Sequence, residues 1–121
     1  MDTLAVTGTI RWQGHPKLTA RTRLTVRLLD VTEADRPSQV VAEITLDPMR
    51  SISIAPDTGE LGVPFALTPE FVDPRRRYVV AAHLYLHAEG KVIPGDQITT
   101  QSYPVLTMGH AMRVEIILRE V

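Results

Sequence analysis

The stretch Arg77-Tyr78-Val79-Val80-Ala81-Ala82-His83-Leu84-Tyr85-Leu86-His87 is the longest apolar run in the chain, and it contains no proline or glycine. Its even positions, from Tyr78 to Leu86, are all apolar or aromatic, whereas its odd positions also include His83 and His87. Alternation with a period of two places the even positions on one face of a β-strand. The run therefore predicts a central strand whose even face packs inward.

Length and composition favour one domain, residues 1–121, of an ordinary globular kind. The formal net charge is -1, so no overall field attracts nucleic acid. The chain has no cysteine, which excludes disulfides, thiolate metal sites and a cysteine nucleophile. No apolar run approaches about 18 residues, so no membrane span is expected. The segment Met1–Leu4 has no signal-peptide pattern. The sequence therefore leaves two localisations open: the cytoplasm, or the envelope if a signal peptide has been removed.

Alternating apolar residues continue on both sides of the central run, separated by turn signals rich in proline and glycine. The expected strands lie within 4–12, 24–31, 40–46, 51–54, 63–67, 77–87, 92–103 and 112–119. Turns are expected at Gly14–Pro16, Pro56–Gly59 and Ala88–Lys91. This pattern predicts an all-β fold, a single antiparallel β-sandwich of about seven to eight strands. A capping pattern at Thr32–Asp35 offers a helix toward Val41 as the alternative, but Pro37 and the β-branched Val40 disfavour it.

The inward faces of four strands predict one buried core. Its expected members are Leu24, Val26, Leu28, Phe65, Val80, Ala82, Leu84, Val114 and Ile116. In the strand 40–46, the same rule places Val40, Ala42, Ile44 and Leu46 on one face.

The odd face of the central strand carries the candidate binding residues His83, Tyr85 and His87. At about 3.3 Å per residue, the two histidines are about 13 Å apart along the strand, too far to share one metal ion. A metal would need further ligands from other strands, such as Glu115 or His110. This face is therefore a candidate binding face for a small molecule or carbohydrate, and no metal or cofactor is expected.

Two other features could contact a partner. The cations Arg75-Arg76-Arg77 could bind phosphate or an acidic partner, although successive strand residues point to opposite sides and a solvated corner is the simpler interpretation. Trp12 with Tyr85 or Tyr103 could form an exposed aromatic patch, but aromatic side chains more often pack in the core. No catalytic motif such as Gly-x-Ser-x-Gly is present, so we do not expect an enzyme.

A series of strand cores and turns along nearly the whole chain resembles the YbaY/YscW-type family of bacterial envelope lipoproteins, which includes pilotins of type III secretion secretins. The segments that carry the resemblance are Val6–Ile10, Leu24–Val31, Gly62–Leu67, Tyr78–Ala82 with Gly90–Val92, Thr99–Val105 and Val114–Ile116. The resemblance implies a small, non-enzymatic β-sandwich that is usually lipid-anchored in the envelope. This chain lacks the lipobox cysteine of that pattern.

The expected function is a pilotin-like or chaperone-like interaction module of the bacterial envelope, with a small-molecule-binding sandwich as the alternative. The expected partner is another envelope protein or a second copy of the chain, bound along a sheet edge. The edges expected from sequence are Val63–Phe65 and Ser51–Ile54, where Ser53→Pro should weaken association. The alternative interpretation is that Pro48, Pro56 and Pro64 prevent such pairing.

Overall fold

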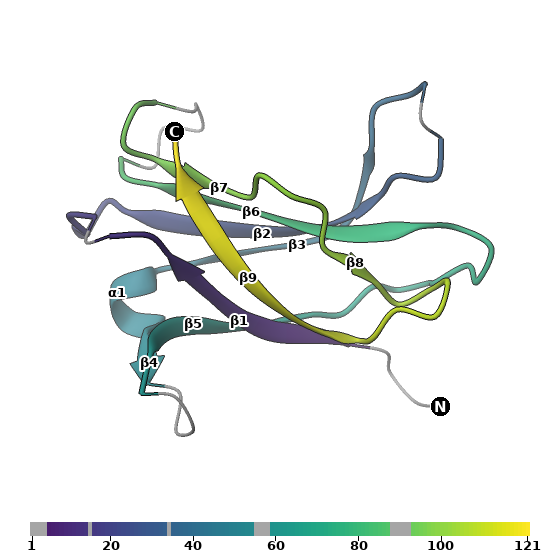
Figure 1. Ribbon diagram of the computed structural model, residues 1–121, viewed down its shortest axis with the longest axis horizontal. Coiled ribbons are helices and arrows are strands. Elements are labelled where there is room, and N and C mark those ends of the chain that lie inside the picture. Colours follow the sequence, from purple (N-terminus) through teal and green to yellow (C-terminus); the bar gives the residue numbers. More distant parts are fainter. Residues whose placement is uncertain (1–4, 15, 34, 55–58, 88–92) are drawn as a thin grey trace.

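The computed structural model describes residues 5–14, 16–33, 35–54, 59–87 and 93–121. Within them, nine strands and one single-turn helix follow one another along the chain (Figure 1). These elements are β1 (Val6–Trp12), β2 (Arg23–Asp30), β3 (Gln39–Leu46), α1 (Pro48–Ser51), β4 (Ser53–Ile54), β5 (Leu61–Leu67), β6 (Tyr78–Tyr85), β7 (Gln97–Ile98), β8 (Pro104–Val105) and β9 (Arg113–Glu120). Most of the strands expected from sequence are confirmed, but the expected strand 92–103 is reduced to β7 and the expected strand 51–54 to β4. Ala88–Lys91 and most of Pro56–Gly59 lie outside the described residues.

The strands form one curled sheet in the order β3-β2-β6-β7-β9-β1-β5-β4, with β8 paired to β6 (Figure 1). All pairs are antiparallel except β1 with β9. The all-β prediction is therefore confirmed, but the sandwich of two separate sheets is wrong, because the sheet is continuous and curls into a half-barrel. Among the described residues, strand pairing joins the two halves only through the two-residue strand β7, which pairs with both β6 and β9.

Beyond β7, the phenol of Tyr103 bridges the space toward β9. Its hydroxyl donates to the carbonyl oxygen of Ile117 (3.3 Å) and accepts from the N–H of the same residue (3.2 Å). The carbonyl of Tyr103 accepts from the N–H of Val80 in β6 (3.0 Å). The side chain and the carbonyl of one buried residue thus supply hydrogen bonds that a longer strand between β6 and β9 would otherwise supply.

The parallel pair β1–β9 depends on Gly8. A Cβ at this position would collide with the carbonyl oxygen of Val114, its partner in β9, and would also press on Phe65. Glycine in a strand interior often marks such a close backbone approach.

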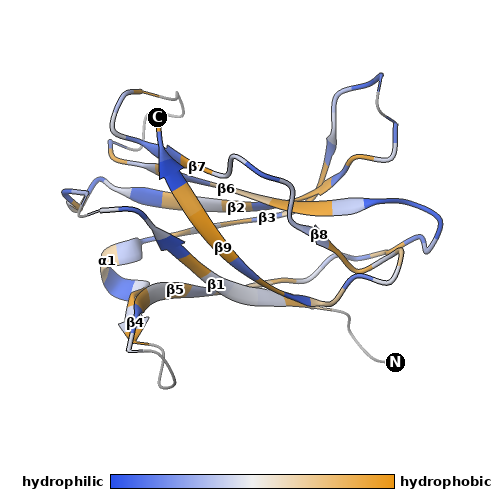
Figure 2. Ribbon diagram, viewed as in Figure 1, coloured by the Kyte–Doolittle hydropathy of each residue, from blue (hydrophilic) through white to orange (hydrophobic). Residues whose placement is uncertain are grey.

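The core lies on the concave side of the curled sheet, where apolar side chains of β2, β6 and β9 meet those of β1 and β5. Figure 2 shows the hydrophobic stretches of these strands. Every predicted core residue is buried in this cluster except Val114, which is half-buried and packs against it. The even face of β6 is buried from Tyr78 to Leu84, as alternation predicted. Leu118, Ile10 and Val6 add to the same core from β9 and β1.

In β3 simple alternation holds for Ala42, Ile44 and Leu46, which pack against the core, and is wrong at Val40. Leu28 of β2 pairs with Ala42 and Leu29 pairs with Val40, so Val41 is an extra residue, as in a β-bulge. The bulge shifts the phase of the strand, and Val41 packs toward the core while Val40 is 54% exposed. The alternative helix toward Val41 is absent from the described residues of that segment, which form a turn and then β3.

The sequence did not predict α1, a single turn that follows β3. Asp47 is its N-cap, and the Asp47 carboxylate accepts from the N–H of Met49 (3.1 Å). Pro48 occupies the first turn, where its missing N–H costs nothing. This turn redirects the chain from β3 toward β4 and β5 at the far end of the sheet.

Candidate partner-binding site

The half-barrel does not close, and a groove separates the edge of β3 from that of β5. The groove has a volume of about 640 Å³ and is lined by Ile44, Thr45, Leu46, Pro64, Phe65 and Ala66. In the described part of the chain, β3 hydrogen-bonds only to β2, and β4 covers only Leu61 and Gly62 of β5. Two strand edges therefore face the same groove, and each leaves backbone groups without a strand partner.

The β5 edge is protected against a new strand. Pro64 stands in the middle of its open part, and its Cα partner on the other side is Thr9 of β1. A proline within a sheet stands where its missing N–H faces away from a partner strand, so β5 lacks a donor on the groove side. The prediction that Val63–Phe65 lies at an edge is thus confirmed, and the proline makes it a poor template.

The β3 edge has no such protection. It runs for eight residues without proline, and four of its residues are Val, Ile or Thr. Glu43 is its only charged side chain, and Val40 stands exposed beside the bulge. Long, uncharged edges rich in β-branched residues are templates for strand addition.

The outer face of β3 is fixed to β2 by polar contacts. Arg27 Nε donates to Glu43 Oε2 (2.6 Å), and this hydrogen bond raises the pKa of the guanidinium against the opposing effect of burial. Two residues along each strand, the hydroxyls of Thr25 and Thr45 lie 3.3 Å apart. These cross-strand contacts hold β3 in register, so its free edge is presented in a defined conformation.

The predicted His83/Tyr85/His87 face is only partly available. His83 is 8% exposed, its Nε2 lies 3.1 Å from Asp96 Oδ2, and its ring stacks on Tyr85 with centroids 3.6 Å apart. His83 is therefore hardly accessible to a ligand, because the loop after β6 brings Asp96 onto it. Tyr85 is half-buried, and His87 lies exposed beyond the end of β6.

Asp96 is fully buried and joins the two ends of the loop between β6 and β7. Its carboxylate accepts from the N–H of Leu86 (2.9 Å), the N–H of Ile93 (3.2 Å) and the His83 ring. Burial opposes the charged carboxylate, but these hydrogen bonds outweigh it and lower the pKa of Asp96. This cluster therefore acts as a structural anchor for the loop.

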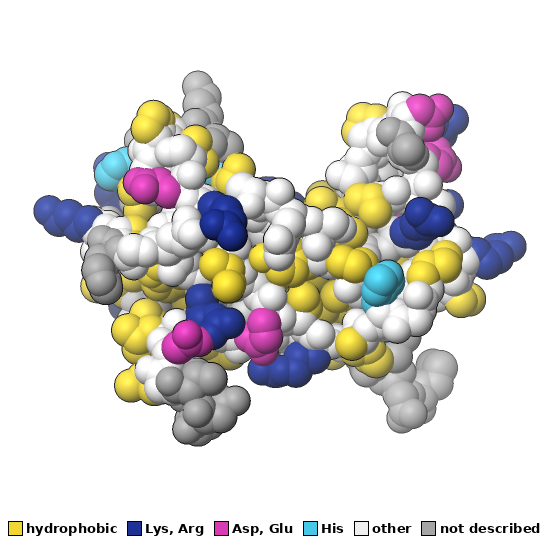
Figure 3. Space-filling view, viewed as in Figure 1, with side chains coloured by type: hydrophobic (Ala, Val, Ile, Leu, Met, Phe, Trp, Pro, Cys, Tyr) yellow, Lys and Arg dark blue, Asp and Glu magenta, His cyan; other side chains and the backbone are white. Residues whose placement is uncertain are grey.

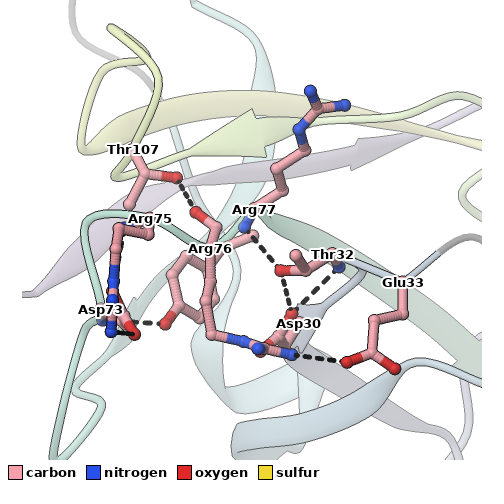
Figure 4. Close-up of polar contacts among 9 residues, drawn as sticks. Asp30, Thr32, Glu33, Asp73, Arg75, Arg76, Arg77 and Thr107 are labelled. Carbon is pink, nitrogen blue, oxygen red and sulfur yellow. Dashed lines mark hydrogen bonds and ion pairs between the residues drawn. The ribbon is translucent and has the colours of Figure 1, made fainter.

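The run Arg75-Arg76-Arg77 is divided among different surroundings (Figure 4). Arg75 pairs with the Asp73 carboxylate, whereas Arg76 pairs with Asp30 and approaches Glu33. Burial opposes ionisation of Asp30, but the hydrogen bond from Arg76 and two from Thr32 outweigh it and lower the Asp30 pKa. The three guanidinium groups thus form no common phosphate site, which agrees with a solvated corner.

The aromatic candidates pack inward. Tyr103 belongs to the core, and Trp12 is half-buried against it. Among the described residues, no three His, Asp or Glu side chains lie close enough to hold a metal ion. No helix in the same part of the chain is long and apolar enough to cross a membrane.

Sequence reasoning missed the β3 edge, which is the main element of the candidate site. The proline-free run 39–46 was a signal for a strand that can accept a partner. What placed this strand at the margin was the pairing order, and no local pattern specifies that order.

Comparison with known proteins places this architecture in a family. The family model for the type III secretion system lipoprotein chaperone YscW matches residues 1–118. The solved structure of an alternative pilotin from the type II secretion system of Vibrio cholerae is similar, with a TM-score of 0.75 and 24% identity over 97% of this chain and 96% of that chain. At this identity the likeness establishes a shared fold, and comparison with curated proteins gave no match. Because the family model covers almost every residue, this chain belongs to the YscW family of type III secretion system lipoprotein chaperones.

Proposed function

We propose that this protein is a non-catalytic, chaperone-like module of the bacterial envelope that binds an extended segment of a secretin subunit along the free edge of β3. The observation that carries the proposal is the proline-free, eight-residue edge of β3 beside a groove of about 640 Å³. Family membership supports a chaperone role, because the family is that of type III secretion system lipoprotein chaperones.

Strand addition at β3 would use backbone and side-chain contacts together. Backbone hydrogen bonds to β3 give sequence-tolerant affinity, each with a net value of about 0.5–1.5 kcal/mol. Alternate side chains of the bound segment would enter the groove over Ile44, Leu46 and Phe65. A partner segment held in this way cannot pair with another copy of itself, which is how a chaperone of this type would prevent premature assembly.

Site-directed photo-cross-linking can test the position of the partner. Residues 1–121 contain no cysteine, so a single cysteine at Thr45 of β3 can carry a benzophenone label, with matched exposed positions at Ser53 of β4 and Arg119 of β9. Each labelled protein is co-purified with the secretin subunit of the same secretion system and irradiated. We expect a cross-link from Thr45→Cys and none from Arg119→Cys.

Three other outcomes would overturn the proposal. A cross-link from Ser53→Cys without one from Thr45→Cys would move the partner to β4, the edge that the sequence suggested. A stable complex with no cross-link from either position would exclude strand addition at both edges. A cross-link between two copies of the Thr45→Cys variant, in the absence of secretin, would make self-association the function of this edge.

A further inference from the structure

A second hollow lies where β8 pairs with the beginning of β6, and it shares no residue with the groove. Its volume is about 430 Å³, and it is lined by Val31, Arg77, Tyr78, Val79, Ser102, Pro104, Thr107, Met108 and His110. In the space-filling view, apolar side chains gather over β8 with a histidine and basic side chains beside them (Figure 3). Pockets that bind small molecules commonly have volumes of about 300–1,000 Å³.

The lining residues combine apolar walls with positive charge and no negative charge. Val31, Val79, Pro104 and Met108 supply the apolar walls, and no Asp or Glu belongs to the lining. The Arg77 side chain extends away from the acidic cluster that pairs its neighbours (Figure 4). No carboxylate of the described residues pairs with Arg77, in contrast to Arg75 and Arg76.

The backbone of Arg77 is held independently of its side chain. Its N–H donates to Thr32 Oγ1 (2.8 Å), and its carbonyl accepts from the N–H of Val31 (2.9 Å). These contacts fix the Cα of Arg77 at the rim of the pocket while the guanidinium has no ion-pair role within the described fold. Because the backbone is fixed and the guanidinium has no ion-pair partner there, the guanidinium is available to bind an anion.

A strained turn forms the opposite wall. Leu106 (φ 70°) and Met108 (φ 58°) are both left-handed, although neither is glycine, and Gly109 (φ 83°) follows them. Left-handed backbone is costly for a residue with a branched or long side chain, and such strain occurs often at ligand sites. The turn places Met108, which is 52% exposed, and His110 at the pocket. A glycine at position 108 would relieve the strain, but it would remove the methionine side chain from the pocket wall.

We propose that this pocket binds a small amphipathic carboxylate, with the anion on Arg77 and the apolar chain against Val31, Val79 and Met108. The guanidinium can donate two parallel hydrogen bonds to a carboxylate, and the His110 imidazole can donate or accept one more at the rim. The apolar part of the ligand would replace water over side chains that are now partly exposed. Two sources share this chemistry, namely a free fatty acid and the terminal residue of a peptide.

Titration of the isotope-labelled full chain, followed by two-dimensional amide NMR, tests this site with four probes. Octanoate represents the fatty acid and N-acetyl-leucine the peptide terminus. Octanamide retains the apolar chain without the charge, and acetate retains the charge without the chain. We expect octanoate or N-acetyl-leucine to shift the amides of β8 and residues 106–111, and to bind at least about tenfold more tightly than octanamide or acetate.

Two variants and a matched control assign the contacts. Arg77→Gln keeps the backbone contacts but removes the charge, so it should weaken carboxylate binding at least about tenfold. Met108→Gly removes an apolar wall and relieves the left-handed strain, so binding should weaken several-fold while the melting temperature stays the same or rises. Arg119→Gln makes the same charge change on β9, outside the lining, and should bind as the parent does.

The tighter of the two carboxylates identifies the source of the ligand, and either result supports the site. Equal affinity for octanoate and octanamide would overturn it, because the charge would then not be recognised. Unchanged binding in Arg77→Gln, or the absence of amide shifts with all four probes, would also overturn it. None of these results depends on the secretin interface at β3, so the two proposals fail independently.

Discussion

Strands β6 and β3 both have eight residues, yet only β6 follows simple alternation along its whole inward face. β6 has β2 on one side and β7 and β8 on the other, whereas β3 has only β2 within the described residues. The bulge at Val41 interrupts β3, and its side-chain phase shifts there. A strand paired on both sides is held in register by two ladders, but an edge strand can accommodate an extra residue.

This difference also separates stability from function in the molecule. The side chains of β6 that face inward are buried and tightly packed, so changes there should act mainly on folding. The side chains of β3 are half-buried or exposed, so many changes there should act on binding with little effect on folding. The following predictions, from the largest expected effect to the smallest, measure how far this separation holds.

Leu84→Ala should lower the free energy of unfolding by about 2–5 kcal/mol, because Leu84 is fully buried in the middle of the core. The cost combines lost transfer energy with the cavity that remains. Urea denaturation of parent and variant measures it. A loss below about 1 kcal/mol would mean that β6 is not the packed centre of the sheet.

Asp96→Asn should lower the free energy of unfolding by about 1.5–3 kcal/mol at neutral pH, because a charged acceptor for three groups at the end of β6 is lost. The folded state lowers the pKa of Asp96, so this carboxylate stabilises the protein above its unfolded pKa of about 3.9. That stabilisation is lost as the pH falls below this value toward the folded pKa.

The parent should therefore lose more stability between pH 5 and acidic pH than Asp96→Asn does. Thermal melts across this range compare the two proteins, with the exposed Asp35→Asn as the matched control. A variant with the same acid sensitivity as the parent would show that the charge on Asp96 does not support this end of β6. Some sensitivity should remain in the variant, because the pKa values of Asp30 and Asp73 are also lowered.

Tyr103→Phe should lower the free energy of unfolding by about 1–2 kcal/mol, because the N–H and carbonyl of Ile117 lose their hydroxyl partner. The ring still fills its place in the core, so the hydrogen bonds alone are tested. Amide hydrogen exchange at Ile117 should become faster, while exchange in β2 should change little. Unchanged exchange at Ile117 would mean that the sheet between β6 and β9 does not depend on this phenol.

Val40→Ala should change the free energy of unfolding by less than about 0.5 kcal/mol, since more than half of this side chain is already in water. Val40 was expected on the buried face, where the same substitution would cost more. Urea denaturation beside Leu84→Ala gives the sharpest contrast between edge and centre. A cost near that of Leu84→Ala would restore simple alternation in β3 and contradict the bulge.

Most of the fold, but less of the candidate site, could be predicted from sequence. Alternation identified the strands and nearly the whole core, because burial on one face of a strand is a local, repeating demand. It did not decide whether the odd face of β6 is solvated or covered, and at His83 the buried Asp96 from a later loop covers that face. Alternation also could not show that Arg77 lies apart from both Arg75 and Arg76, because the acids that pair with these two come from a turn and from a distant segment.

The sequence by itself determined an all-β chain, the inward faces of its strands and its membership of the YscW family. Only the tertiary structure decided that β1 and β9, from opposite ends of the chain, pair in parallel, and that β3 and β5 end as the unclosed edges of a half-barrel. It also decided that Arg77, Met108 and His110 line one pocket. The physical reason is that the periodicity of a strand depends on a few consecutive residues. Its pairing with a neighbour depends on the whole arrangement, which must bury all apolar faces and also hydrogen-bond the backbone N–H and C=O groups.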